Sequence, residues 1–320
     1  MAIKALITGG MPEHLLENLR VPGYDIRHIE NPTDEELAEA EVIVGFPSVP
    51  RLAAAKNLKW LQIPWSGADG YADHPDFPGH VLLTNATGAF GRPIAEHIFA
   101  AVFALMRRFP LYRDNQNRCV WERVGDEISP TGKRVLIMGA GDIGGNAAML
   151  FKKFDCHVTG VRRVARECPA HFDAMLSLSE AESALPHADI VVCAMPNTPL
   201  TSGWFDRRRL GLLKKGAIFV NVGRGSIVDH YALAEALRSG ALFGAALDVT
   251  EPEPLPADHP LWKCPNLLLT PHVSGQTFMG LKDKEEFFFS LCRENLELYR
   301  DGKPLKNIVD LKTGYRVTTG

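Results

Sequence analysis

The sequence predicts an α/β protein built from two domains, each with a parallel sheet. Three observations lead to this fold class. The chain has 320 residues, and single hydrophobic cores usually stop growing at about 250–300 residues. Its 46% hydrophobic and 23% charged residues are typical of globular proteins. Short apolar runs alternate with helix-like segments in two separate series, and this alternation indicates parallel sheets.

The first series occupies about a hundred residues. Its apolar, β-rich runs predict strands at residues 3–8, 24–29, 42–46 and 58–63. Segments with helical character, at 13–19 and 34–40, lie between them. The glycines that follow the first run lack the spacing of a phosphate-binding loop, so we interpret them as a tight turn from strand to helix.

The second series follows a helix at 94–107 that is apolar nearly all round, a pattern typical of a helix buried between layers or at a subunit interface. It predicts strands at 134–138, 157–161, 188–194, 217–222, 241–249 and 267–270, and helices at 143–154 and 231–239. An amphipathic stretch at 277–300 predicts a long helix that returns the chain to the first domain. We therefore assign residues 1–92 and 293–320 to one domain and 93–292 to the other.

Charge and cysteine content exclude several classes of function. The formal net charge of −3 provides no basic field for nucleic acid or anionic lipid. The six cysteines are scattered without C-x-x-C pairs, which predicts free thiols in a reducing compartment. No apolar run is long enough to span a membrane, and the first ten residues are interpreted as a strand, not a signal peptide. We expect a cytoplasmic protein with a small-molecule partner and no nucleic-acid or membrane partner.

A glycine-rich motif, GAGDIG, starts at Gly139, after a predicted strand and before a predicted helix. In this context Gly139 permits the turn, Gly141 lets the backbone approach a pyrophosphate, and Gly144 allows close packing of helix on strand. The N–H groups at the start of the helix, at Asp142 and Ile143, then bind the anion. The motif predicts a dinucleotide-binding domain, with a purely structural turn as the alternative.

The next strand ends in arginines where NAD-binding domains carry an acid. Arg162 lies 23 residues beyond Gly139 and is followed by Arg163. A guanidinium cannot accept hydrogen bonds from the ribose hydroxyls, but it can bind a 2′-phosphate in forked geometry. We therefore predict NADP(H) as the preferred cofactor, with NAD(H) possible. The alternative is that both arginines are solvated surface charges.

Three further motifs follow apolar runs, and each carries one residue suited to catalysis. They are NVGRGSIVD with Arg224, ALDVTEPEPLP with Glu253, and TPHVSGQT with His272. Ligands of open α/β sheets bind at the carboxyl ends of the strands, where these residues are expected. The set fits reduction of a 2-oxo acid. An arginine binds the carboxylate and carbonyl, a histidine moves a proton, and a carboxylate orients and charges that histidine.

Motifs along nearly the whole chain resemble those of D-isomer-specific 2-hydroxyacid dehydrogenases, the family of glyoxylate/hydroxypyruvate reductases and of D-lactate, phosphoglycerate and formate dehydrogenases. The matching stretches are SGAD at 66–69, IAEH at 94–97, the glycine motif, MPNTPLT at 195–201, NVGRGSIVD, LDVTEPEP and TPHVSG. The resemblance implies two Rossmann-like domains, one flavodoxin-like and one dinucleotide-binding, with a cleft between them.

The resemblance also implies roles for the catalytic residues. Arg224 would bind the substrate's carboxylate and carbonyl oxygen, His272 would be the acid/base, and Glu253 its partner. The backbone N–H groups of Ser66 and Gly67 would bind the other side of the carboxylate.

Further roles concern the cofactor and the oligomer. Asp248 would face the nicotinamide, while Pro196 and Thr201 would line the nucleotide groove. Trp121 matches a tryptophan that in some relatives reaches the partner subunit's active site, which predicts a homodimer with residues 94–130 buried. The alternative is that Trp121 packs within its own subunit. His97 lies in the apolar helix and is interpreted as a core residue.

These inferences predict an NADPH-preferring reductase of a small 2-oxo acid, similar to glyoxylate or hydroxypyruvate, that forms the D-2-hydroxy acid. One alternative is a dinucleotide-sensing regulator of the corepressor type on the same fold. The complete set of Arg224, Glu253 and His272 argues against it. Formate oxidation is less favoured, because formate needs no histidine that donates a proton.

Overall fold

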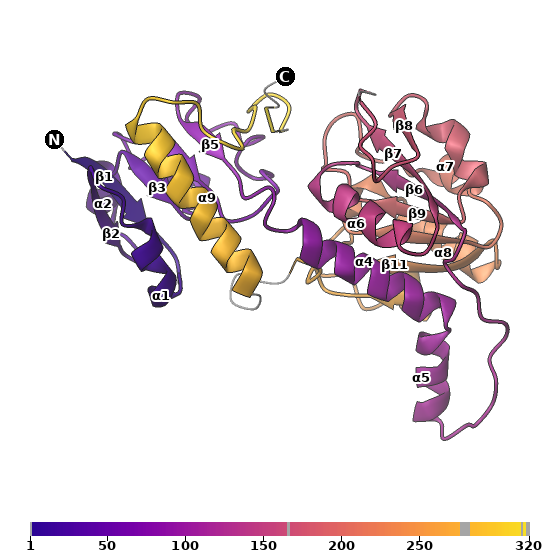
Figure 1. The fold of residues 1–320 in the computed structure, drawn as a ribbon. Coiled ribbons are helices and arrows are strands. Elements are labelled where there is room, and N and C mark those ends of the chain that lie inside the picture. Colours follow the sequence, from indigo (N-terminus) through magenta and orange to yellow (C-terminus); the bar gives the residue numbers. More distant parts are fainter. Residues whose placement is uncertain (1, 165–166, 276–281, 315, 318–320) are drawn as a thin grey trace. The chain divides into compact units, whose positions relative to one another are not determined.

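The computed structural model describes residues 2–164, 167–275, 282–314 and 316–317. The chain divides into two compact units (Figure 1). Unit 1 comprises residues 1–90 and 276–320, and unit 2 comprises residues 91–275. Each unit has one parallel sheet with helices, so the predicted fold class of two parallel-sheet α/β domains is confirmed. Within the described ranges, no helix has the length and apolar character needed to cross a membrane.

Unit 1 has a five-stranded sheet in the order β2-β1-β3-β4-β5, which is the flavodoxin-like order. Its strands are β1 (Ile3–Ile7), β2 (Tyr24–His28), β3 (Val42–Val44), β4 (Trp60–Gln62) and β5 (Leu82–Thr84). Its first helices are α1 (Glu13–Leu16), η1 (Glu17–Leu19), α2 (Asp34–Glu39) and α3 (Val49–Leu52). The sequence did not predict β5, a strand of only three residues.

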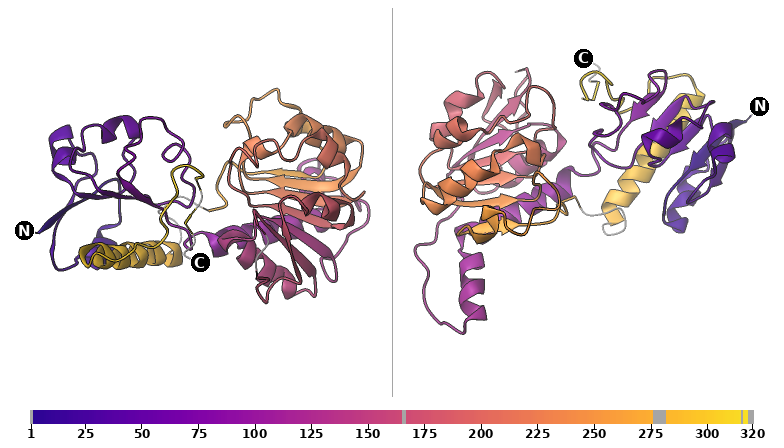
Figure 2. Two further views of the ribbon diagram at one scale, coloured as in Figure 1. Left: turned by 90° about the horizontal axis from the view of Figure 1, so that it is seen from above. Right: turned by 180° about the vertical axis from the view of Figure 1, so that it is seen from behind.

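The long helix α9 (Lys282–Arg300) lies across one face of this sheet (Figure 2). Its fully buried Asn295 donates a hydrogen bond from Nδ2 to Oε1 of the equally buried Gln62, at 3.1 Å. The ring of Tyr299 stacks on Trp60 with centroids 5.4 Å apart. Because α9 packs here, the units divide after residue 275, whereas the sequence analysis placed this boundary after residue 292. The predicted start of the helix, 277–281, lies outside the described residues.

Unit 2 has seven parallel strands in the order β12-β11-β10-β9-β6-β7-β8. Counted from β6, this is the doubly wound order 3-2-1-4-5-6 with one more strand at the end. The strands are β6 (Arg134–Met138), β7 (His157–Arg162), β8 (Ala174–Ser177), β9 (Ile190–Cys193), β10 (Ala217–Asn221), β11 (Leu242–Leu247) and β12 (Leu267–Leu269). The sequence did not predict β8, whose four residues are all half-buried and give little apolar contrast.

Helices flank the sheet of unit 2 or extend away from it (Figure 1). They are α4 (Gly91–Met106), α5 (Phe109–Asn117), α6 (Asp142–Lys152), η2 (Ala181–His187), α7 (Arg207–Gly211), η3 (Gly225–Ile227), α8 (His230–Arg238) and η4 (Pro260–Lys263). Helices α4 and α6 lie side by side (Figure 1). A Cβ built on Gly91 would lie 2.3 Å from Oδ1 of Asp142, so a larger residue at position 91 would displace the Asp142 side chain.

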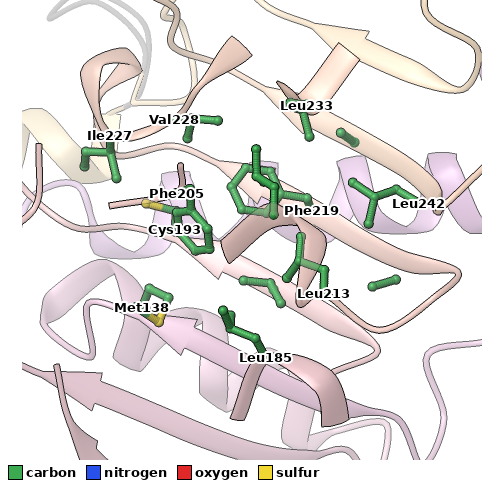
Figure 3. Close-up of a cluster of buried hydrophobic side chains, with 14 of the residues drawn as sticks. Met138, Leu185, Cys193, Phe205, Leu213, Phe219, Ile227, Val228, Leu233 and Leu242 are labelled. Atoms are coloured by element: carbon green, nitrogen blue, oxygen red, sulfur yellow. The ribbon is translucent and has the colours of Figure 1, made fainter. Parts of the chain in front are cut away.

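A buried apolar cluster joins the strands of unit 2 to η2 and α8 (Figure 3). Phe205 and Phe219 meet edge to face in it, with ring centroids 4.8 Å apart. Fixed packing of this kind holds the strand ends in place.

The loop after α5, in contrast to this cluster, carries a large side chain that is not packed. The side chain of Trp121 is fully exposed, so the alternative in which Trp121 packs within its own subunit is wrong.

Because His230 is buried and its pKa is lowered, we expect unit 2 to become less stable in acid. This residue starts α8 and is only 5% exposed, and its Nε2 has no hydrogen-bond partner in the described part of the chain. Burial, with a smaller contribution from His259, lowers the pKa of His230 from 6.5 to about 4. Between pH 6.5 and pH 4 the unfolded chain therefore binds more protons at His230 than the folded chain does. The free energy of unfolding keeps its full value above pH 6.5 and falls as the pH drops towards 4. The loss is on the order of 3 kcal/mol.

Urea unfolding at pH 7.5 and pH 4.5 measures this effect. We expect His230→Leu to reduce the difference in unfolding free energy between the two pH values by about 2–3 kcal/mol. An undiminished difference in this variant would show that other groups cause the acid sensitivity.

Candidate active site

The glycine motif forms the turn between β6 and α6. Gly139 has a φ of +101°, and a Cβ built there would lie 2.5 Å from the carbonyl oxygen of Ala194. A Cβ on Gly144 would lie 2.2 Å from the carbonyl oxygen of Gly139. Both positions therefore require glycine.

The other side of this turn is open. Gly141 is exposed at the N-terminus of α6, and a Cβ built on it would have no described atom within 4 Å. Helix α6 begins at Asp142 and continues through Ile143, whose N–H groups belong to the first turn and have no acceptor within the helix. This combination of a tight turn, an exposed backbone at Gly141 and the first turn of a helix fits the pyrophosphate of a dinucleotide.

Arg162 ends β7 beside the glycine motif. Its Nε donates a hydrogen bond to the carbonyl oxygen of Ala140 at 2.9 Å, which fixes the guanidinium next to the turn. Arg163 follows and is exposed. Burial lowers the pKa of His171, and the charge of Arg162 lowers it further. The structure thus places positive charge at the end of the second strand, where the sequence predicted it.

Arg224 follows β10 in a loop that a buried asparagine holds. Asn221 is fully buried, donates from Nδ2 to the carbonyl oxygen of Arg224 at 3.0 Å, and accepts from the N–H of Gly223 at 3.0 Å. The Arg224 guanidinium donates through Nη1 to the carbonyl oxygen of Gly223 at 2.8 Å. A Cβ on Gly225 would lie 2.0 Å from the carbonyl group of Thr250. The Arg224 loop therefore lies directly against the loop that carries Glu253.

Glu253 and His272 form a hydrogen-bonded pair. His272 Nδ1 lies 2.9 Å from Glu253 Oε2, while Glu253 Oε1 accepts from the N–H of Thr250 at 3.0 Å. The side chains are 52% and 39% exposed, and exposed pairs of this kind contribute little to stability. The contact instead fixes the orientation of the imidazole. The structure thus brings together two of the three predicted catalytic side chains and places the Arg224 loop beside them.

Asp248 anchors the segment that carries His272. It is 2% exposed, and its carboxylate accepts hydrogen bonds from the Thr270 hydroxyl and from the N–H groups of Val273 and Ser274. Burial alone would raise the pKa of Asp248, but the hydrogen bonds from Ser274 and Thr270 outweigh it, and the net pKa is lowered. The ionised carboxylate therefore organises residues 270–274, a role that the sequence analysis did not foresee.

Thr201 and Pro196 belong to the loop after β9. The Thr201 side chain is 2% exposed, and its hydroxyl donates to the carbonyl oxygen of Pro196 and accepts from the N–H of Thr198. Pro196 itself is exposed. Thr201 thus shapes the loop, and Pro196 is the part of it available to a ligand.

Ser66 and Gly67 lie in unit 1, in the loop after β4. Both are half-buried, and Asn85 Nδ2 donates to the carbonyl oxygen of Ser66 at 2.7 Å. In the same loop the exposed ring of Trp65 contacts Phe46, with centroids 5.1 Å apart. Asn85 and Asn221 were not predicted as site residues: Asn221 lies near the end of a predicted apolar run, whereas Asn85 directly follows β5, which was not predicted.

The fold and the site of unit 2 define a class of protein. A doubly wound sheet with a glycine cradle binds a dinucleotide at the carboxyl ends of its strands. A histidine paired with a carboxylate at the same edge supplies an acid/base, as hydride transfer to or from a carbonyl requires. Unit 2 therefore has the fold and the site of a dinucleotide-dependent oxidoreductase.

Comparison with known proteins gives the family. The model of the D-isomer specific 2-hydroxyacid dehydrogenase, NAD binding domain, matches residues 99–274. A solved D-isomer specific 2-hydroxyacid dehydrogenase family protein from Aeromonas salmonicida subsp. salmonicida A449 is 34% identical with a TM-score of 0.85, over 97% of this chain and 100% of that one. This chain belongs to the D-isomer-specific 2-hydroxyacid dehydrogenases and is an NAD(P)-dependent oxidoreductase acting on CH–OH groups.

Two further relatives show the range of the family. A D-isomer specific 2-hydroxyacid dehydrogenase from Xanthobacter autotrophicus Py2, solved in complex with NADPH and MES, is 29% identical with a TM-score of 0.84, over 98% of this chain and 100% of that one. The chloroplastic/mitochondrial formate dehydrogenase of Arabidopsis thaliana is 30% identical over 274 residues, which are 80% of this chain and 71% of that protein. These relatives confirm the predicted family and give no support to a regulator that only binds dinucleotide.

Proposed function

We propose that this enzyme reduces a small 2-oxo acid, similar to glyoxylate or hydroxypyruvate, to the D-2-hydroxy acid, with NADPH as the preferred cofactor. The observation that carries the proposal is the His272–Glu253 pair at 2.9 Å, beside the Arg224 loop at the carboxyl edge of the sheet. Reduction of a carbonyl needs a proton at oxygen, and this pair can deliver one. Oxidation of formate needs no such proton, which is why we favour a 2-oxo acid over formate.

The residues of the chain bind the substrate and move the proton. The Arg224 guanidinium would bind the carboxylate and the carbonyl oxygen of the 2-oxo acid in a fork, and the N–H groups of Ser66 and Gly67 would bind the carboxylate's other side. When bound, the dihydronicotinamide supplies the hydride for C2. His272 would give the proton on Nε2 to the carbonyl oxygen, while Glu253 holds Nδ1 and stabilises the imidazolium before the transfer.

The cofactor would be held along the strand ends of unit 2. The backbone around Gly141 and the first turn of α6 would bind the pyrophosphate. Pro196 would line the nucleotide groove, with Thr201 fixing its loop, and Asp248 would lie at the nicotinamide end.

The preference for NADPH rests on Arg162 and Arg163. Two adjacent guanidinium groups at the end of β7, one of them fixed to the carbonyl oxygen of Ala140, fit the 2′-phosphate of NADPH better than the two hydroxyls of NADH. We also propose that the enzyme is a homodimer. Its support is the full exposure of Trp121 on the loop after α5, since a large exposed apolar side chain suits an interface.

A dinucleotide-oxidation assay tests the proposed function. We expect turnover of glyoxylate or hydroxypyruvate, with kcat/KM for NADPH about 10–100-fold above that for NADH, the range that a charged hydrogen bond supplies. Arg162→Ala should remove most of this ratio, whereas Arg207→Ala, which breaks a surface pair with Glu235, should preserve it.

The panel also includes pyruvate, bulkier 2-oxo acids, and formate with NAD⁺ or NADP⁺. A wild-type enzyme with the higher kcat/KM for NADH would overturn the cofactor preference. Turnover of formate alone would replace the substrate class, and no turnover of any compound would return the binding-only alternative.

A further inference from the structure

The segment that carries His272 has a strained backbone. His272 has a φ of +54°, in the left-handed region that residues other than glycine occupy only when their surroundings hold them there. Its own N–H donates to the carbonyl oxygens of Asp248, at 2.8 Å, and of Thr270, at 3.0 Å. The direction of the imidazole therefore depends on what fixes residues 270–274.

The Thr270 side chain links this segment to Asp248 and to helix α4. Its hydroxyl lies 2.6 Å from Asp248 Oδ1 and 3.4 Å from His97 Nε2 on helix α4. Because the Asp248 carboxylate is ionised, it can only accept, so the hydroxyl proton goes to Asp248. The Thr270 oxygen then accepts from the N–H at His97 Nε2. The result is a chain of donors that runs from His97 through Thr270 to Asp248.

The chain of donors ends at the turn that holds His272. Asp248 Oδ1 also accepts from the N–H of Val273, and Oδ2 accepts from the N–H of Ser274, each at 2.9 Å. The Thr270 contact is shorter than either of these, and the Ser274 side chain also forms a hydrogen bond to the buried carboxylate. Without the Thr270 hydroxyl, Oδ1 would lose this short contact, and the carboxylate could rotate away from the two N–H groups that follow His272.

We propose that Thr270 is a positioning residue for the reaction: its hydroxyl, anchored by His97, fixes Asp248 so that the turn keeps His272 aimed at the substrate. The proposal rests on the proposed role of His272 as proton donor. It gives a function to His97, which the sequence analysis interpreted as a core residue. His97 is only half-buried, and its longer contact predicts a smaller effect than that of Thr270.

A matched pair of variants at residue 270 tests the role of the hydroxyl. Thr270→Val has nearly the same shape without the hydroxyl, and Thr270→Ser keeps the hydroxyl without the methyl group. We expect Thr270→Val to lower kcat by about 10–100-fold, the range that a misplaced catalytic group produces. Thr270→Ser should stay within about threefold of the wild type. The Kd for NADPH and the Tm of both variants should remain close to wild type.

A second readout does not depend on turnover. In NMR spectra of the protein with ¹³C-labelled histidine, we expect the His272 ring signals to move in Thr270→Val and to remain in place in Thr270→Ser. At position 97, His97→Gln keeps an N–H donor and His97→Phe removes it, so His97→Phe should cause the larger loss of kcat. The comparison of His97→Gln with His97→Phe tests the proposal independently if Thr270→Val fails to fold.

The outcomes separate this inference from the proposed function. The positioning role of Thr270 would be overturned if Thr270→Val kept the wild-type kcat and its His272 signals did not move. If His272→Ala were inactive at the same time, the proposed function would still stand. Equal losses in Thr270→Val and Thr270→Ser would show that the hydroxyl is not responsible and would also overturn the positioning role. Full activity of His272→Ala would instead overturn the proposed function.

Discussion

Replacement of His272 with alanine is expected to lower kcat for 2-oxo acid reduction by about 10²–10⁴-fold, the usual contribution of a general acid. The Kd for NADPH should change little, because the glycine cradle and Arg162 lie at other strand ends of unit 2. Glu253 holds Nδ1 of His272, so Nε2 is the ring nitrogen that would donate the proton to the substrate. Alanine at position 272 removes this donor.

Steady-state kinetics and fluorescence titration of NADPH measure the two quantities. His80→Ala removes an exposed histidine of unit 1 and serves as the matched control, with wild-type kcat expected. Glu253→Gln should give an intermediate loss, since an amide still accepts from Nδ1 but carries no charge to stabilise the imidazolium. A His272→Ala enzyme with kcat within about twofold of wild type would contradict an acid role.

The substitution Arg224→Lys is expected to reduce kcat/KM for the 2-oxo acid by at least about 100-fold, even though it keeps the positive charge. A guanidinium binds a carboxylate and a carbonyl oxygen through a planar fork, whereas an ammonium is a point charge. In addition, Nη1 of Arg224 donates to the carbonyl oxygen of Gly223, and this contact holds the plane of the fork.

The control is Arg238→Lys on helix α8, where we expect wild-type kinetics. The Kd for NADPH should be unchanged in both variants, so that the loss is assigned to the substrate. Equal losses for the substrate and for NADPH in Arg224→Lys would indicate a general disturbance of the loop and would contradict the proposed contact.

The sequence predicted those elements of the fold that bury a continuous apolar run. The strand β6 was predicted with its observed bounds, and β10 to within one residue, since both are central and buried on two faces. The edge strand β8 was missed because its four residues are all half-buried and end in a serine, whereas β5 was missed although its apolar run resembles that of β12, which was predicted. The helix α5 was missed because its nine residues are mostly polar and begin directly after another helix.

The candidate site was predictable to the extent that strand ends determine it. Arg224, Glu253 and His272 follow the neighbouring parallel strands β10, β11 and β12, so the sheet itself brings their loops to one edge. The supporting contacts of Asn221 and Asp248 depend on rotamers and on the left-handed turn at His272, and no spacing in the sequence encodes them. The part played by His97 was hidden for the same reason, since its partner Thr270 is distant in the sequence.

The most direct test of the central claim is a crystal structure of the enzyme with NADP⁺ and oxamate, an unreactive analogue of a 2-oxo acid. We expect the Arg224 guanidinium in a fork on the carboxylate and carbonyl oxygens of oxamate, and His272 Nε2 within about 3 Å of that carbonyl oxygen. Glu253 should remain on Nδ1. Oxamate bound away from His272, or Arg224 turned away from oxamate in the complex, would contradict the account.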